Sequence, residues 1–504
     1  MQKERINWGD HSAKTLATTK SVKILRTFGN KSDLIFHRLS VTGFIRHFNY
    51  FSLLLIVLLC GVGCSTIKSH DRQFASIYSD YRQGDFDAAA EKTESRSFQK
   101  KLKSNDRLLW AMEAGKLHHA AGDFEESNRY FETAEAIIQD FEERAVFSLR
   151  AGAARAAAFV TNPGALPYGG TWSDKILINT YKALNYLALG DLEGARVEVR
   201  RAYERQQEAI EQNQKAIEEA RADHGSYRGI VDQSEFEKAA PVDPAVAQAY
   251  ADFSNPFTTL VSGIVALADR DPARAEVDFN LLASLPSANS FVKKEQQQIE
   301  NYLSGKDPAA LDRPRVFVIF ENGLGPTREE MRVDLVLPDL GYTGFAFPEL
   351  VFQPTNVGGI KIATSAQPAT ISEPVASIDQ IVATEFRARL PIMVLETISA
   401  IIAKEVAAKQ LTDEWDGIGL LIGSLYKLAV NRADTRIWKT LDKEFQFAVF
   451  DYPPDRIARF SLVGKSKNEL TTSYEVPLPD ADFVLVLARS VNQHDLRITT
   501  QALR

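Results

Sequence analysis

The stretch INTYKALNYLALGDLEGARVEVRRAYERQ, residues 178–206, decides the fold of the first half of this chain. It predicts two antiparallel helices joined by a turn at Gly190-Asp191-Leu192. Small residues at fixed offsets from the turn let such helices approach closely, and the aromatic Tyr186 can fill the gap to the next pair. The small residues here are Ala183, Ala195 and Ala202.

Three further turns follow the same pattern, at Gly84-Asp85-Phe86, Gly122-Asp123-Phe124 and Arg270-Asp271-Pro272. In the last of these units Phe279 occupies the large position that Phe131 occupies in the second. The first unit matches least, because Ile77 and Arg96 stand where small residues belong. The small residues of the second and last units are Gly115, Ser127, Ala134, Gly263 and Ala275.

The repeated pattern resembles the tetratricopeptide repeat, whose period is about 34 residues. The step from Gly122 to Gly190 equals two such periods, so a degenerate unit is expected between them, in the alanine-rich residues 141–160. The alternative is a generic helical bundle in which the Gly-Asp turns are coincidental. Either alternative predicts an all-α first half.

The pattern of the sequence changes after residues 304–308, where runs of residues that favour β-strands replace helical patterns. Between the runs lie a predicted helix at 378–390 and two apolar helices at 393–407 and 417–430, which we expect to pack in the core. The sequence therefore predicts an α+β domain, a β-sandwich with a helical insert. The expected strands are 315–320, 331–337, 344–352, 359–363, 444–451, 457–463, 473–478, 482–489 and 497–500.

The apolar run at residues 51–64, FSLLLIVLLCGVGC, predicts export from the cytoplasm. Basic residues precede it and small residues lead to Cys64, which is the order found in a secretory signal. The ending resembles a bacterial lipobox, in which Cys64 would be lipidated, although Gly61 stands where leucine is usual. The alternative is an uncleaved signal anchor. The residues upstream suggest an over-extended gene start, with initiation near Val41.

The predicted organisation has three parts. Residues 1–63 form an N-terminal extension and lipoprotein signal peptide, residues 64–305 a helical repeat domain and residues 310–504 the α+β domain. The net charge of −7 argues against nucleic acid as the main partner, because phosphates need a basic surface. Both cysteines lie in the signal region, so the mature chain needs core packing without a disulfide.

Catalytic and metal motifs are missing from the sequence. The histidines after Cys64 have no spacing with carboxylates that is typical of a metal site, and no HExxH, CxxC, GxSxG or Walker pattern occurs. Adjacent His118 and His119 are expected on different faces of one helix. We therefore expect a protein that is not an enzyme, with neither a cofactor nor a metal.

Two surfaces are candidates for recognition. A loop with Tyr168 and Trp172 precedes the helix bearing Arg196, Arg200 and Arg201, and together they could grip an extended acidic peptide or a glycan. The alternative is that the two aromatic residues cap an exposed helix edge. The second surface is residues 433–438, ADTRIW, where a buried Arg436 paired with Asp434 would fasten the helices to the strands.

The chain resembles a family of uncharacterised tetratricopeptide-containing lipoproteins of Gram-negative envelopes. The resemblance lies in residues 178–206, 316–338 (VFVIFENGLGPTREEMRVDLVLP), 344–349 (GFAFPE) and 432–441 (RADTRIWKTL). These motifs carry no assigned chemistry, so the resemblance implies no activity. Our first hypothesis is a lipid-anchored adaptor that faces the periplasm, and Ser65 directly after Cys64, in place of aspartate, favours the outer membrane over the inner one. The adaptor would hold a protein partner in envelope or peptidoglycan biogenesis. The competing class is a peptidoglycan-binding module that stacks glycans on Tyr168 and Trp172.

Overall fold

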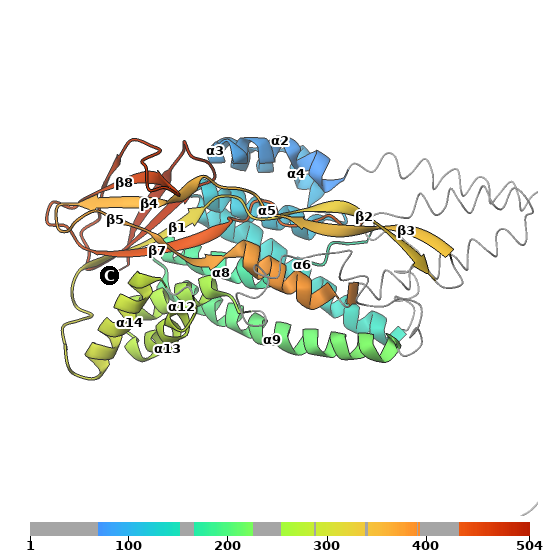
Figure 1. Ribbon diagram of the computed structural model, residues 1–504, viewed down its shortest axis with the longest axis horizontal. Coiled ribbons are helices and arrows are strands. Elements are labelled where there is room, and N and C mark those ends of the chain that lie inside the picture. Colours follow the sequence, from blue (N-terminus) through green and yellow to red (C-terminus); the bar gives the residue numbers. More distant parts are fainter. Residues whose placement is uncertain are drawn as a thin grey trace, which may run out of the picture. The chain divides into compact units, whose positions relative to one another are not determined.

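The computed structural model describes residues 69–151, 166–224, 254–286, 289–337, 341–390, 392–393 and 433–503. Within the compact unit Ser65–Arg504, helices come first along the chain and strands follow (Figure 1). The all-α first region and the strand-rich second region are therefore as predicted. The signal run and Cys64 lie outside the described residues, as do the predicted apolar helices beyond Met393.

Four helix hairpins form the first region. Three more helical segments accompany them: η1 (Lys92–Glu94), α4 (Arg96–Lys101) and α14 (Ser290–Leu303). The hairpins are α2 (His70–Arg82) with α3 (Phe86–Glu91), α5 (Arg107–Ala121) with α6 (Phe124–Ala151), α8 (Trp172–Ala188) with α9 (Leu192–His224), and α12 (Pro256–Ala268) with α13 (Pro272–Ala283).

The same hydrogen bonds shape all four turns. The residue before each turn aspartate has a positive φ: 84° at Gly84, 84° at Gly122, 77° at Gly190 and 59° at Arg270. A left-handed residue ends a helix and frees the chain to start the next one. Each aspartate then accepts a hydrogen bond from the backbone N–H three residues later, which caps the second helix. The predicted turns are confirmed at all four places.

Small residues face large ones between the paired helices, as the sequence predicts. A Cβ atom on Gly115 would lie 2.5 Å from the ring of Phe131, and one on Gly263 would lie 2.8 Å from the ring of Phe279. The expectation of a degenerate unit at 141–160 differs from the structure. Residues 141–151 instead continue α6, which packs directly against α8, and the rest of that stretch lies outside the described residues.

The strands form two sheets and a separate hairpin, and all nine predicted strands are present. The five-stranded sheet has the order β11-β10-β1-β7-β6, with β1 parallel to β10 and Val316 paired with Val484. The four-stranded sheet has the order β5-β4-β8-β9, and among the strands that the structure describes β2 pairs with β3 alone. The strands are β1 (Arg315–Asn322), β2 (Thr327–Leu337), β3 (Gly341–Val351), β4 (Val357–Thr364), β5 (Thr370–Ile371), β6 (Glu373–Ser377), β7 (Glu444–Asp451), β8 (Ile457–Gly464), β9 (Tyr474–Pro477), β10 (Phe483–Ser490) and β11 (Arg497–Ala502).

Strand β1 is buried on both faces, because each face meets a different hydrophobic cluster. Val316, Val318 and Phe320 pack with residues of the four-stranded sheet. Phe317 and Ile319 pack in a cluster that also contains residues of α5, α6, α8 and α12. Alternation along a strand sends neighbouring side chains to opposite faces. The five-stranded sheet therefore lies between the helices and the second sheet.

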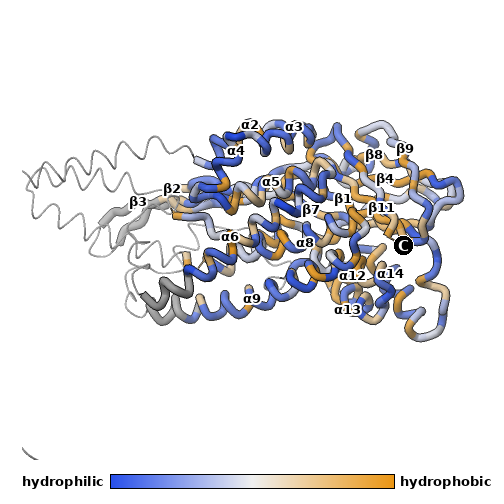
Figure 2. Tube along the Cα trace, turned by 180° about the vertical axis from the view of Figure 1, so that it is seen from behind, coloured by the Kyte–Doolittle hydropathy of each residue, from blue (hydrophilic) through white to orange (hydrophobic). Residues whose placement is uncertain are grey.

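Hydropathy follows this layering. Figure 2 shows apolar residues gathered where α12 meets the strands, whereas α9 is largely hydrophilic along its length. Residues 378–390 are helical, as predicted. In the described part of the chain, no helix has both the length and the apolar character needed to cross a membrane.

Candidate functional site

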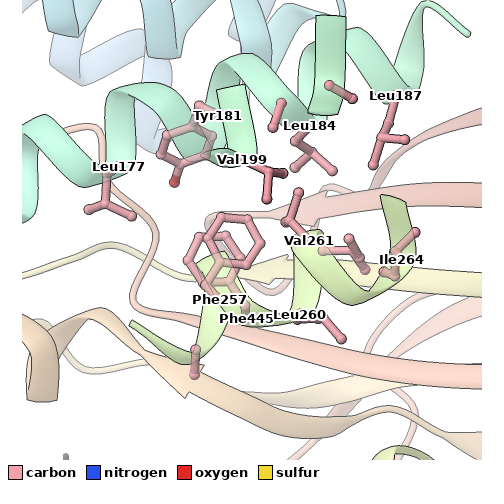
Figure 3. Packing of buried hydrophobic residues seen from close by; sticks show 14 of the residues in the cluster. Leu177, Tyr181, Leu184, Leu187, Val199, Phe257, Leu260, Val261, Ile264 and Phe445 are labelled. Atoms are coloured by element: carbon pink, nitrogen blue, oxygen red, sulfur yellow. The ribbon is translucent and has the colours of Figure 1, made fainter. Parts of the chain in front are cut away.

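The strand region covers the inner side of the helix hairpins. Phe257 of α12 stacks on Phe445 of β7 with 3.4 Å between ring centroids, and Tyr181 of α8 lies against Trp438. Figure 3 shows Phe257 and Phe445 overlapping beneath Tyr181, with Leu184 and Val261 beside them. These contacts are buried and apolar, so a partner of the hairpins must use another surface.

An acidic groove of about 840 Å³ lies between α6, α8 and α9. Seven carboxylates and three basic side chains line it, together with Tyr186 and Val197. The carboxylates are those of Glu132, Glu135, Glu142, Glu193, Glu198, Glu204 and Glu208, and the basic residues are Lys182, Arg201 and Arg205. We call this surface the α6–α9 groove; it carries an excess of negative charge.

Ion pairs hold the base of the α6–α9 groove. The Lys182 ammonium is buried between Glu135 and Glu198, with its Nζ 3.0 Å from Glu198 Oε1. Burial lowers the pKa of Lys182, but these two carboxylates outweigh burial and raise it above its ordinary value. At the rim, Glu132 and Glu193 are exposed and make no ion pair with any described residue. The unpaired negative charge is therefore at the mouth.

The arginines singled out in the sequence border a second groove, of about 480 Å³, between α9, α12 and α13. Arg196, Arg200 and Arg201 all line it, so the structure does bring them together. Each is already paired with a carboxylate: Arg196 with Asp269 at 2.9 Å, Arg200 with Glu204 at 3.1 Å and Arg201 with Glu198 at 2.7 Å. This pairing weakens the case for an acidic peptide as their ligand.

Tyr168 and Trp172 line neither groove. Tyr168 is 5% exposed, its hydroxyl donates a hydrogen bond to Asp174 at 2.8 Å, and Arg436 lies over its ring. A buried ring offers no face to a sugar, so Tyr168 is not a stacking surface. Trp172 is half-buried at the start of α8, where its backbone N–H donates to Glu385 and Lys175 lies over its ring. Tyr168 therefore packs in the interior beside the first turn of α8.

The predicted contact at residues 433–438 is present. Arg436 pairs with Asp434 at 2.7 Å and with Asp106 at 2.8 Å, and it also donates to the carbonyl of Leu166. Asp106 immediately precedes α5, so one guanidinium joins the segment before β7 to the helices. Arginine suits this role because its planar fork can donate to several acceptors at once.

A buried charge network, which sequence reasoning missed, lies where α5 meets the strands. Lys116 Nζ lies 2.9 Å from Asp442 Oδ2 and 3.5 Å from Glu321 Oε2. Arg489 pairs with the same Glu321, and His119 Nε2 lies 2.8 Å from Glu321 Oε1. Burial, then Arg489, lower the pKa of Lys116 to about 7. The available signal was charged residues inside apolar runs, such as Glu321 in RVFVIFEN.

His118 and His119 take different faces of α5, as predicted. His118 contacts Thr93 and Asp123, whereas His119 reaches across to Glu321 and Asn185. Burial lowers the pKa of His119 well below its ordinary value, so the ring is neutral. His119 is therefore a packing and hydrogen-bonding residue rather than an acid or base open to solvent.

Glu113 gives the fold a pH dependence that can be measured. Burial raises the pKa of Glu113 to about 7 from 4.5, even though it accepts hydrogen bonds from Lys439 N–H and from Thr440. A carboxyl group with a raised pKa contributes stability that is complete below its unfolded pKa and is lost as pH rises through the folded pKa. Between about pH 5 and about pH 8, the stability of wild type relative to Glu113→Gln should fall by at most about 3 kcal/mol.

Urea unfolding of both proteins at the two pH values measures this change. Glu469→Gln, at an exposed carboxylate paired with Lys361, serves as the control and should leave the pH slope unchanged. If the difference in free energy of unfolding between wild type and Glu113→Gln is the same at both pH values, the raised pKa of Glu113 is contradicted.

Comparisons with protein-family models, curated proteins and solved structures find no match for this chain.

Proposed function

We propose that this protein is a lipid-anchored adaptor that binds a protein partner through the outer side of its helix hairpins. The four hairpins with one turn chemistry support a tetratricopeptide-like array. The apolar cluster shared by the two sheets supports a β-sandwich-like second region. Anchoring by lipidation of Cys64 at the periplasmic face of the outer membrane rests on the lipobox-like sequence.

The α6–α9 groove carries the proposal, because it is large, acidic and open. Its rim bears Glu132 and Glu193, which make no ion pair within the described part of the chain, while Val197, 45% exposed, adds an apolar spot. A segment with lysines or arginines around one apolar residue complements such a surface in charge and in hydrophobicity. The partner chemistry is thus basic, opposite to the acidic peptide expected from the arginines of α9.

Peptide binding tests the proposal directly. A fluorescein-labelled peptide of lysines around a central leucine should bind the protein, and its affinity should fall as salt rises. In the double variant Glu132→Gln/Glu193→Gln we expect the dissociation constant to rise about tenfold, which corresponds to about 1.4 kcal/mol. Fluorescence anisotropy measures both effects.

A variant with the same change in net charge provides the matched control. Glu469→Gln/Glu475→Gln removes two exposed carboxylates near the four-stranded sheet, away from the groove, and should bind the peptide as wild type does. Equal weakening in both double variants would mean that only net charge matters, and it would refute a specific groove. A glutamate-based peptide that binds more tightly than the lysine peptide would also refute it.

A further inference from the structure

Three potential metal ligands from three segments meet beside the first two hairpins. Glu94 ends η1, His118 lies in the last turn of α5 and Glu126 lies in the first turn of α6. One ligand atom from each residue lies within 4.8 Å of the other two. His118 is buried, Glu126 is half-buried and Glu94 is exposed, so the cluster reaches from the interior to the surface. The three segments explain why a search for ligand spacing along the sequence did not find it.

The His118 ring is held in place by its neighbours. Its Nδ1 lies 3.2 Å from Asp123 Oδ2, its Nε2 lies 2.9 Å from Thr93 Oγ1, and the ring stacks on Tyr130. Histidines that bind metals commonly use one nitrogen for the ion while the other N–H donates to a carboxylate or similar acceptor. Asp123 supplies a carboxylate of this kind for Nδ1, so the ion would take Nε2 in place of its present contact with Thr93. As the cap of α6, Asp123 is itself fixed in position.

Arg129 would compete with a metal ion for the Glu126 carboxylate. Its guanidinium pairs with Glu126 one turn along α6, where the arginine side chain is 54% exposed. The arginine donates to both carboxylate oxygens of Glu126, which is half-buried, so an ion must replace both hydrogen bonds. Because the arginine side chain is exposed, water can solvate it once it is released, which limits the cost of breaking the pair.

We propose that Glu94, His118 and Glu126 form a binding site for a divalent transition-metal ion of the zinc class. A neutral imidazole with carboxylate oxygens suits Zn²⁺ and its neighbours, whereas Ca²⁺ and Mg²⁺ favour oxygen ligands alone. Three protein ligands leave a coordination position open to water. Since the ligands come from η1, α5 and α6, the ion fastens the end of the first hairpin to the second and stabilises the folded chain.

Isothermal titration of Zn²⁺ into the untagged, chelator-treated full chain tests the proposal. We expect one ion to bind at this site, Glu94→Gln to weaken its binding at least tenfold and His118→Gln to abolish it. His494→Gln removes an exposed histidine elsewhere and should bind Zn²⁺ as wild type does. Far-UV circular dichroism checks the fold of each variant.

The exposed position of Glu94 keeps the test decisive. Its replacement leaves the core untouched, so Glu94→Gln can be read even where His118→Gln fails to fold. A Glu94→Gln protein that binds Zn²⁺ with wild-type affinity overturns the proposal, as does a titration in which His494→Gln alone loses the ion. A thermal unfolding midpoint that Zn²⁺ raises in wild type and not in Glu94→Gln supports it.

Discussion

Replacing Glu321 with glutamine is expected to lower the free energy of unfolding by about 3–5 kcal/mol. The Glu321 carboxylate is buried and contacts Arg489, Lys116 and the neutral His119. Its loss leaves the buried Arg489 guanidinium without its principal partner. Burial lowers the pKa of Arg489 to about 10, so this arginine stays protonated at neutral pH. A buried charge that loses its counter-charge is costly, because water cannot solvate it.

Urea unfolding at neutral pH measures the effect, with two comparisons. Glu469→Gln breaks the exposed pair with Lys361 and should cost at most about 1 kcal/mol. The double variant Glu321→Gln/Arg489→Met removes both charges and should recover part of the stability, since an uncharged contact replaces an uncompensated charge. A Glu321→Gln protein about as stable as Glu469→Gln would refute a network of this strength.

Trp438→Ala is expected to lower the free energy of unfolding by about 3–5 kcal/mol. The Trp438 side chain is fully buried and lies against the rings of Phe131 and Tyr181, with centroids 5.9 Å away in both cases. Its indole N–H donates to Thr440 Oγ1 at 3.1 Å. The substitution opens a cavity between the helices and the segment before β7, and it leaves that hydroxyl without its donor.

The half-buried Trp172 provides a matched tryptophan. Because its side chain is only half-buried, Trp172→Ala should cost clearly less than Trp438→Ala in the same urea experiment. Thermal unfolding should rank the two variants in the same order. Equal losses would contradict the view that Trp438 joins the helices to the strands and Trp172 lies at the margin.

Local patterns predicted much of the secondary structure. The Gly-Asp turns specify helix ends through the positive φ at Gly84, Gly122 and Gly190 and through aspartate caps, which depend only on nearby residues. The strands were predictable from β-rich runs for the same reason. Offsets between small and large residues also predicted close helix pairs, because that spacing is set by helix geometry.

The degenerate unit was expected at 141–160 because the step from Gly122 to Gly190 equals two repeat periods. The length of a step does not show which helices pack against each other. Residues 141–151 extend α6, which lies directly on α8, so the two hairpins need no unit between them in the described part of the chain. The sequence left the environment of Tyr168 open for a related reason. An aromatic residue in a glycine-rich loop is expected to be exposed when only the sequence is known. In the structure Arg436, from a distant segment, lies over the Tyr168 ring.

The sequence by itself determined the order of helices and strands and the four helix turns, because caps, turns and apolar periodicity act over a few residues. Only the tertiary structure decided that the strands pack against the hairpins and that α6, α8 and α9 together form the acidic α6–α9 groove. It alone also joined Lys116 to Glu321 and Asp442 and gathered Glu94, His118 and Glu126. The physical reason is that electrostatic and packing partners are chosen by distance in space, and residues far apart in the chain carry no local mark of one another.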